Sequence, residues 1–315
     1  MNRGRRRTRG RDVNGVLVLD KQPGMSSNDA LQRVKHIFRA AKAGHTGSLD
    51  PLATGVLPLC FGEATKLSQY LLDSDKRYWT TVLLGVRTDS GDADGKVVEE
   101  RPVAGVTAAR VEAALQRFIG EIDQIPSMFS AVKHQGQPLY KLARQGIEVE
   151  RKPRRITVFE CKLVAYRDTE FDLEIHCSKG TYVRSIAEEL GEDLGCGAHV
   201  TALRRLKAGP FSVADLVTME QLEAVLANDG LPGLDALLLP VWSAVRDWPD
   251  VRLEEVSAYY LRQGQSVMVP HAPSQGWVRL SQAVVGDKGE GEGEFLGVGE
   301  VLDDGRIAPR RLLAA

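Results

Sequence analysis

The chain has 315 residues, of which 43% are hydrophobic and 26% charged, values that are typical of a soluble globular protein and exclude an intrinsically disordered one. No run approaches the roughly 18 consecutive apolar residues of a transmembrane helix, so we expect no membrane segment. The near balance of 41 basic and 42 acidic residues gives by itself no sign of a nucleic-acid partner.

The basic residues are distributed unevenly along the chain. Residues 1–11 hold six arginines and no acidic residue, and a second basic cluster runs from residue 125 to residue 156. Such clusters attract phosphate backbones, although a solvated tail explains an isolated arginine-rich terminus equally well. We expect residues 1–12 to form a flexible basic arm.

The cysteines and the first residues of the chain indicate the cellular compartment of the protein. Four widely spaced cysteines without a Cys-x-x-Cys pair predict buried thiols in a reducing compartment. The apolar run behind the arginines, residues 15–19, is far shorter than the core of a secretory signal. We therefore expect a cytoplasmic protein.

The first half of the chain predicts a strand, a helix and an irregular loop. Residues 13–20 form a short apolar run that ends at a turn over 22–24, which indicates a buried strand. Ser26 or Ser27 can cap a following helix, whose apolar face comprises positions 31, 34, 37, 38 and 41. The stretch 44–55 holds three glycines and a proline, which predicts a loop carrying polar residues.

Further along, helical and strand patterns mix rather than alternate. Thr107 can cap a helix that ends at Gly120, residues 171–177 alternate as a strand does, and a helix is expected to start near Thr181. Thr218 and Gln221 form a capping box for another helix. This mixture predicts an α+β fold with a mixed, mainly antiparallel sheet.

The composition shifts near residues 242–249. Four short strand-like pieces separated by glycines follow, at 266–269, 277–280, 295–301 and 306–308. We therefore expect a catalytic domain over 13–250 and a small β-barrel-like domain over 251–315. The acidic, glycine-rich segment 286–294 is expected to be an exposed hairpin loop.

Several familiar motifs can be excluded. The chain has no phosphate-binding Gly-x-x-x-x-Gly-Lys loop, and Glu294 stands where a dinucleotide motif needs its third glycine. Asp92 and Asp94 faintly resemble a calcium loop, but Arg101 occupies the position of its bidentate glutamate, which leaves a plain Asp-rich turn. Cys177, Cys196 and His199, even with His176, make a poor zinc set because neighbouring strand residues point to opposite faces. We predict no metal and no cofactor.

One motif remains, the string Gly44-His45-Thr46-Gly47-Ser48-Leu49-Asp50-Pro51-Leu52-Ala53-Thr54-Gly55. A proline restricts the backbone of Asp50, and the flanking glycines allow a ligand to approach the main chain. An Asp-Pro in such a loop is by itself most often a turn. The whole string, however, closely resembles the signature motif of the TruB family of RNA pseudouridine synthases.

The resemblance extends over most of the chain. Residues 19–27 are similar to the family's first motif, except that Gln22-Pro23 stands where Pro usually follows Lys. Residues 75–78, 125–133, 177–184 and 197–205 match further motifs in order. The last 65 residues resemble the PUA domain of bacterial members. The resemblance implies a pseudouridine synthase fold and isomerisation of the uridine at position 55, in the T loop of tRNA.

The resemblance also implies residue roles. Asp50 would be the nucleophile or the electrostatic partner of the reaction, paired with Arg184, whose charge would lower the pKa of the carboxyl group. Tyr78 would stack on the target base, and it is also a candidate general base. Tyr182 and Leu203 would contact the uracil, while His45 would fill the gap that the flipped base leaves. Lys21 would support the pocket.

The basic cluster over 125–156 aligns with the insertion that closes over the T stem-loop in this family. Phosphate contacts of this kind fix the register of the RNA without reading its bases. The residues expected to make them are Lys133, Arg144, Arg151, Lys152, Arg154 and Arg155. We expect tRNA as the partner, no obligatory protein partner, and a monomer.

Two alternatives stay open. A guide-RNA-dependent synthase of the dyskerin type shares the motif and the PUA domain, but it works inside a multiprotein particle and does not need a clamp of its own. An RNA-binding or tRNA-folding protein with dispensable catalysis would keep the basic segments without depending on Asp50.

Overall fold

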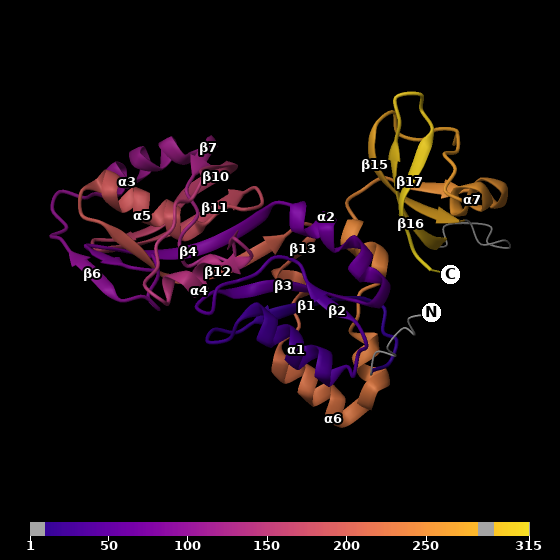
Figure 1. The fold of residues 1–315 in the computed structure, drawn as a ribbon, viewed down its shortest axis with the longest axis horizontal. Coiled ribbons are helices and arrows are strands. Elements are labelled where there is room, and N and C mark those ends of the chain that lie inside the picture. Colours follow the sequence, from indigo (N-terminus) through magenta and orange to yellow (C-terminus); the bar gives the residue numbers. More distant parts are fainter. Residues whose placement is uncertain (1–9, 283–292, 315) are drawn as a thin grey trace.

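The computed structural model describes residues 10–282 and 293–314. Its centre is a twisted nine-stranded sheet (Figure 1), in which seven strands follow the order β1-β3-β12-β4-β11-β10-β7, while β2 pairs with β3 and β13 with β12. Within this described sheet only β3 and β12 run parallel. The predicted α+β fold with a mainly antiparallel sheet is confirmed.

The elements have the following bounds. The central sheet comprises β1 (Gly15–Lys21), β2 (Ala43–His45), β3 (Thr54–Phe61), β4 (Lys76–Leu84), β7 (Gly120–Gln124), β10 (Arg154–Arg167), β11 (Glu170–Cys177), β12 (Ala198–Ala208) and β13 (Phe211–Ser212). Two small hairpins pair β5 (Val86–Thr88) with β6 (Val97–Glu100) and β8 (Lys133–His134) with β9 (Gln137–Pro138). The helices are α1 (Ser27–Ile37), α2 (Ser68–Asp73), α3 (Ala108–Leu115), α4 (Leu139–Ala143), α5 (Val183–Leu194), α6 (Met219–Ala236) and α7 (Glu255–Arg262).

The strand and helix starts follow from the local sequence. β1 is an apolar run with both faces covered, since Leu17 and Leu19 belong to the main core and Val16 and Val18 to a second one. Ser26 caps α1 by accepting a hydrogen bond from the amide of Asp29. The predicted caps Thr107 and Thr218 also form, and Thr218 completes its capping box with Gln221.

Some predicted boundaries were wrong. The helix over 107–120 ends earlier, because a 3-10 turn over Gln116–Phe118 leads directly into β7. Arg11 is not part of a free arm, since it forms a bridge with Ala40 and an ion pair with Asp235 at 2.5 Å. Residues 1–9 of the expected arm, and residues 286–292 of the expected acidic hairpin, lie outside the described residues.

The C-terminal part forms its own sheet, in the order β14 (Asp250–Leu253), β15 (Gly276–Gln282), β16 (Glu294–Val301) and β17 (Ile307–Leu312). It lies at one end of the molecule (Figure 1). The predicted barrel-like form was wrong for the described residues, because this sheet is open. β14 forms one edge of this sheet. Among the described strands it pairs only with β15, to which it is parallel, so the sheet does not close on itself.

Aromatic packing fixes this C-terminal sheet against the rest of the chain. The Tyr70 ring of α2 lies 5.0 Å from Trp248 and 5.1 Å from Trp277 of β15, centroid to centroid. The Lys66 ammonium adds a hydrogen bond of 3.1 Å to the carbonyl of Leu312 in β17. In the described residues no helix is long and apolar enough to cross a membrane.

Candidate active site

The loop between β2 and β3 presents Asp50 where the parallel pair β3 and β12 begins. Gly55 has a φ of +94°, and a Cβ there would lie 2.4 Å from the carbonyl oxygen of Arg205, so only glycine allows this close approach. The loop is held at its other end by Ser27, whose hydroxyl donates to the carbonyl of Leu49 and accepts from its amide. The backbone on both sides of Asp50 is therefore fixed.

Lys21 anchors the turn that follows Asp50. The side chain is fully buried, and its ammonium donates to the carbonyls of Ala53 at 2.6 Å, Gln22 at 3.0 Å and Pro51 at 3.2 Å. Burial lowers the pKa of Lys21 to about 8, while the nearby Asp50 opposes that shift. This geometry agrees with the expected supporting role.

Arg184 joins Asp50 to a second carboxylate. The guanidinium is almost fully buried, and Nη2 lies 2.9 Å from Asp50 Oδ2 while Nη1 lies 3.2 Å from Asp92 Oδ2. Two carbonyls accept its remaining bonds, those of Ser90 at 2.8 Å and Phe129 at 2.9 Å. A planar guanidinium held at four points has one orientation, so Arg184 presents a fixed positive charge to Asp50.

Opposing influences act on the Asp50 carboxyl group. Burial raises its pKa above the ordinary value, and the negative charge of Asp92 raises it further. The charges of Arg184 and Lys21 lower the pKa and so limit the rise. The direct ion pair with Arg184 favours the ionised form, which is the form a nucleophile needs.

Tyr78 and Leu203 come from adjacent strands. Tyr78 on β4 lies opposite Arg205 on β12, and Leu203 lies opposite Thr80. Burial raises the pKa of the Tyr78 phenol above its ordinary value, so the hydroxyl is protonated near neutral pH. Tyr78 packs against the main core, in which Leu203 is buried. The two side chains offer an apolar contact surface near Asp50.

His45 is the last residue of β2, directly before the loop that carries Asp50. Burial and the charge of Arg205 lower the pKa of His45, so the ring is neutral. Its buried Nδ1 has no hydrogen-bond partner among the described residues, and neither has the buried hydroxyl of Ser130 in the insertion. Buried polar atoms are seldom left without a partner, so both are available to a bound ligand.

Gln124 fixes the start of α5, the helix that carries Arg184. Its side chain is 3% exposed, accepts from the amide of Tyr182 at 2.8 Å and donates to the carbonyl of Tyr182 at 3.1 Å. Tyr182 is the N-cap residue of α5, two positions before Arg184. Because Gln124 ends β7 at the root of the insertion, one amide group ties the insertion to the helix that carries Arg184.

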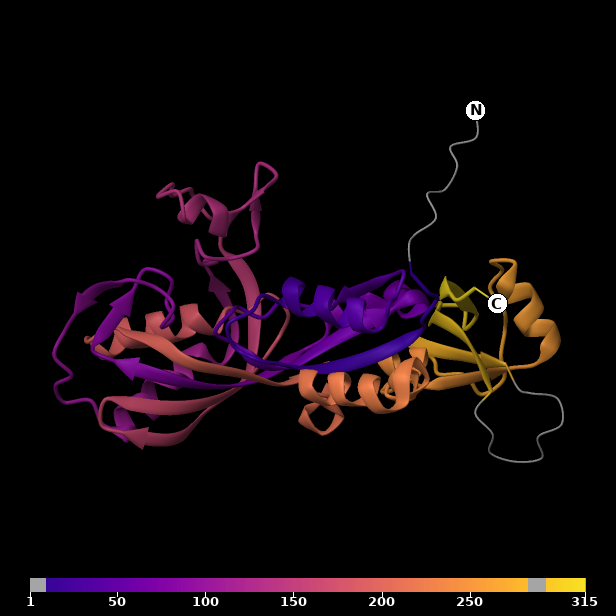
Figure 2. The same ribbon diagram turned by 90° about the horizontal axis from the view of Figure 1, so that it is seen from below.

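The insertion projects from the body of the molecule (Figure 2). It contains the hairpin β8–β9 and α4, but Arg154 and Arg155 lie outside it, as the first residues of β10 paired with β7. Among the residues expected to bind phosphate, four have no carboxylate within 4.0 Å in the described chain, and all four are exposed: Lys133, Arg144, Lys152 and Arg154.

The other two expected phosphate ligands form ion pairs within the chain. Arg151 pairs with Glu148 at 3.2 Å and donates to the carbonyl of Pro126. Arg155 pairs with Asp123 at 2.8 Å and with Glu121 at 3.3 Å. RNA phosphates would have to compete with these carboxylates, so the geometry favours the unpaired residues as phosphate ligands.

A cavity of about 780 Å³ lies beside the site, between α5, β5–β6 and the root of the insertion. It is separate from the site because its lining includes neither Asp50 nor Tyr78. Four carboxylates of α5 line it, Glu188, Glu189, Glu192 and Asp193. Three arginines also line it, Arg87, Arg117 and Arg151, and each is paired with a carboxylate of the lining or its neighbourhood. Because its cations are already paired, this cavity is a poor match for a phosphate backbone.

Sequence reasoning missed three residues of the site. The sequence predicts a plain Asp-rich turn at Asp92, whereas the structure shows that this carboxylate holds Arg184. Arg205 is 1% exposed and donates to the carbonyls of Val56 and Gly47, which fixes the loop before Asp50. Together with Gln124, these residues act through contacts across long stretches of sequence, which no local pattern reveals.

Comparisons with known families match nearly the whole chain. Residues 35–183 match the family described as TruB family pseudouridylate synthase (N terminal domain). Residues 184–246 match the tRNA pseudouridylate synthase B C-terminal domain, and residues 249–313 match Pseudouridine synthase II TruB, C-terminal.

Two similar full-length proteins carry a name that agrees with these family matches. A protein named tRNA pseudouridine synthase B from Nitrosococcus oceani is 56% identical over 308 residues, which is 98% of this chain and 97% of the relative. One from Tolumonas auensis with the same name is 55% identical over 98% of this chain and 95% of its own length.

Solved structures share the fold. A Cbf5-Nop10-Gar1 complex matches with a TM-score of 0.73 and 25% identity, over 95% of this chain and 84% of the other. An H/ACA RNP bound to a substrate RNA matches with a TM-score of 0.71 and 22% identity, over 96% of this chain and 85% of the other. The site geometry, the family matches and the full-length relatives lead to one assignment: the chain belongs to the TruB family of pseudouridylate synthases.

Proposed function

We propose that this enzyme converts the uridine at position 55 in the T loop of tRNA to pseudouridine, as a monomer and without a guide RNA or protein partner. One observation carries the proposal most directly: Asp50, in the middle of the family's signature string, lies 2.9 Å from the buried Arg184. The relatives named tRNA pseudouridine synthase B support tRNA as the substrate.

The reaction detaches uracil from C1′ of the ribose, turns it and reattaches it through C5, with no net redox change. Asp50 is the catalytic carboxylate, acting either as a nucleophile or by stabilising charge at the sugar. Arg184 keeps Asp50 ionised and fixes its orientation. Because isomerisation needs neither an electron acceptor nor a group donor, these side chains suffice for the chemistry we assign.

The target base must leave the stack of the loop to reach Asp50, which costs a few kcal/mol. Tyr78 stacks on the extruded base, because its ring borders the site. We assign it this role rather than proton abstraction, since a phenol with a raised pKa stays protonated and is a weak base. Leu203 and Tyr182 contact the uracil. His45 enters the vacated position in the loop, where a neutral ring stacks without bringing charge into the bases.

The unpaired cations of the insertion and of the start of β10 bind the phosphates of the T stem-loop. Lys133, Arg144, Lys152 and Arg154 are exposed and face no carboxylate in the described chain. This supply of cations favours a stand-alone enzyme over a dyskerin-type one, for which partner proteins hold the RNA. Four buried, unpaired thiols support action in a reducing, cytoplasmic compartment.

The test is release of tritium from tRNA transcript labelled at uracil C5, because the new bond at C5 displaces that hydrogen. Purified protein alone should release one tritium per tRNA, and a transcript with cytidine at position 55 should release none. No release at micromolar enzyme would overturn the stand-alone assignment. Release from the cytidine transcript would overturn the assigned position.

A further inference from the structure

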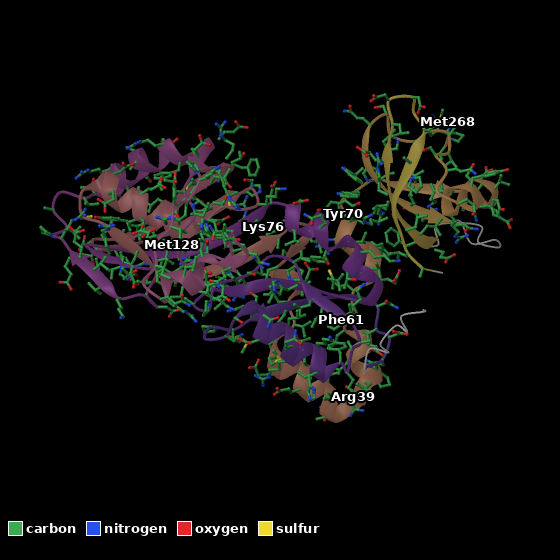
Figure 3. All side chains as sticks on the ribbon, viewed as in Figure 1. Arg39, Phe61, Tyr70, Lys76, Met128 and Met268 are labelled. Atoms are coloured by element: carbon green, nitrogen blue, oxygen red, sulfur yellow. The ribbon has the colours of Figure 1, made fainter. Side chains whose placement is uncertain are left out.

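A second basic surface lies at the C-terminal end of α1, away from the site described above. A shallow concave region of about 460 Å³ is lined there by Gly10, Gln32, Lys35, His36, Arg39 and Ala40. Lys42 is exposed three residues after Arg39. Figure 3 labels Arg39 at the outer edge of the molecule, next to α6 and far from Met268 in the C-terminal part. We call Lys35, Arg39 and Lys42 the α1 basic surface.

The cations of this surface form no direct ion pair in the described residues, although Lys42 lies near enough to Glu63 to lower the pKa of that carboxyl group. Within residues 10–282 and 293–314, no carboxylate lies within 4.0 Å of Lys35, Arg39 or Lys42. Two neighbouring arginines differ in this respect, since Arg11 pairs with Asp235 and Arg33 pairs with Glu223, both at 2.5 Å. The unpaired positive charge is thus concentrated on the three residues around the concave region.

Stabilisation of α1 by cations near its C-terminus explains Lys35 but not Arg39. Lys35 lies in the last turn of α1, where a cation interacts favourably with the helix dipole. Arg39 lies beyond the helix, with a φ of +50°, a conformation in which glycine is the favoured residue. A strained position that carries an exposed guanidinium instead of glycine is consistent with a role for the side chain itself.

The surrounding contacts relate this surface to both the active site and the chain terminus. Figure 2 shows α1 (indigo) at the same edge of the molecule as the insertion, with α6 (orange) at the opposite edge. Lys42 directly precedes β2, which ends at His45. The amide of Arg11 donates to the carbonyl of Arg39 at 2.8 Å, so Arg11 lies directly beside Arg39.

We propose that the α1 basic surface binds phosphate groups of the tRNA backbone and forms an RNA contact separate from the insertion. This inference rests on the proposed function for the identity of the RNA. It adds a second group of cations at the edge of the molecule that also carries the insertion, so that the RNA backbone is held at two phosphate-binding regions. The contact contributes to affinity and is not needed for the chemical step.

The test measures binding of intact tRNA to the full-length protein by fluorescence anisotropy across a salt series. The triple variant Lys35→Gln, Arg39→Gln, Lys42→Gln should weaken binding by about fivefold or more and should reduce the log–log salt slope by roughly 2 to 3, as expected from the loss of that many phosphate contacts. Its kcat at saturating tRNA should stay within twofold of the unsubstituted enzyme.

Two single substitutions separate charge from folding. Arg39→Gly suits the left-handed backbone, so it should preserve the melting temperature while weakening binding, and Arg39→Lys should keep most of the affinity. Arg33→Gln is the control for a single lost charge: it removes one positive charge from α1, six positions before Arg39, at a residue already paired with Glu223, and it should leave the salt slope unchanged.

Unchanged affinity and salt slope in the triple variant would overturn the α1 contact. An equal effect of Arg33→Gln would also overturn it, because the loss would then reflect net charge alone. The proposed function fails independently: a protein that binds tRNA but releases no tritium refutes the assigned reaction, while the binding measurement still tests this surface.

Discussion

Arg184 contacts Asp50 through the same nitrogen, Nη2, that donates to the carbonyl of Phe129, and both distances are 2.9 Å. The carboxylate assigned to catalysis and the root of the insertion, which we propose binds RNA, therefore share one guanidinium. A displacement of Phe129 would move the Arg184 guanidinium and so change its distance from Asp50. The ionisation of Asp50 therefore depends on how Arg184 is held.

Asp92 holds the other side of Arg184, so we expect Asp92→Asn to lower kcat by roughly 10- to 100-fold through loss of Arg184 orientation. The KM for tRNA should change little, because Asp92 is buried and offers no surface to a ligand. Steady-state kinetics check this. Asp94→Asn is the control, as Asp94 is an exposed residue of the same turn. A raised KM with normal kcat would show that Asp92 acts on binding instead.

The acid limb of the pH–rate profile should report the Asp50 carboxyl group. The proposed mechanism requires the ionised form, so we expect activity to fall as pH drops through a pKa that burial has raised above the ordinary value. Arg184→Gln removes the charge that lowers this pKa, so the limb should move to higher pH. Asp92→Asn removes a charge that raises it, so the limb should move to lower pH. Single-turnover rates between pH 4 and 9 measure both shifts, and shifts in the same direction would contradict the account.

Tyr78 should act through its ring more than through its hydroxyl. Tyr78→Phe keeps the stacking surface and loses only the phenol, so its single-turnover rate should fall at least roughly tenfold less than that of Tyr78→Leu. Equal losses in the two variants would assign the proton-transfer role to the hydroxyl.

Gln124 should position Tyr182 and, through α5, Arg184. Gln124→Leu removes both hydrogen bonds to Tyr182 and leaves the Tyr182 amide without a partner, which costs about 1–3 kcal/mol of stability. The Tyr182 carbonyl keeps its bond from the amide of Ile186. We expect a lower melting temperature and a lower kcat. Gln124→Glu keeps the acceptor for the Tyr182 amide, so it should recover part of the kcat. The exposed Gln137 of the insertion provides the control, Gln137→Leu. A kcat unchanged in a folded Gln124→Leu protein would leave Gln124 with a structural role only.

The sequence predicted the features that short-range patterns encode. The caps at Ser26, Thr107 and Thr218 and the strand over 171–177 follow from local propensity and periodicity, and the structure confirms them. The open C-terminal sheet was not predicted, because nothing local indicates that β14 pairs in parallel with β15 across the 22 residues between Leu253 and Gly276. The same limit hid Asp92 and Gln124, whose partners lie 92 and 58 positions away.

The central claim is that the Asp50 carboxylate carries the reaction. It is tested most directly by tritium release from C5-labelled tRNA under single-turnover conditions, with tRNA affinity measured on the same Asp50→Asn protein. We expect the rate to fall by at least ~10⁴-fold, while the dissociation constant stays within about threefold because the phosphate contacts are unchanged. A rate within about tenfold of the unsubstituted enzyme would contradict the claim, since the amide has neither the charge nor the nucleophilicity of the carboxylate.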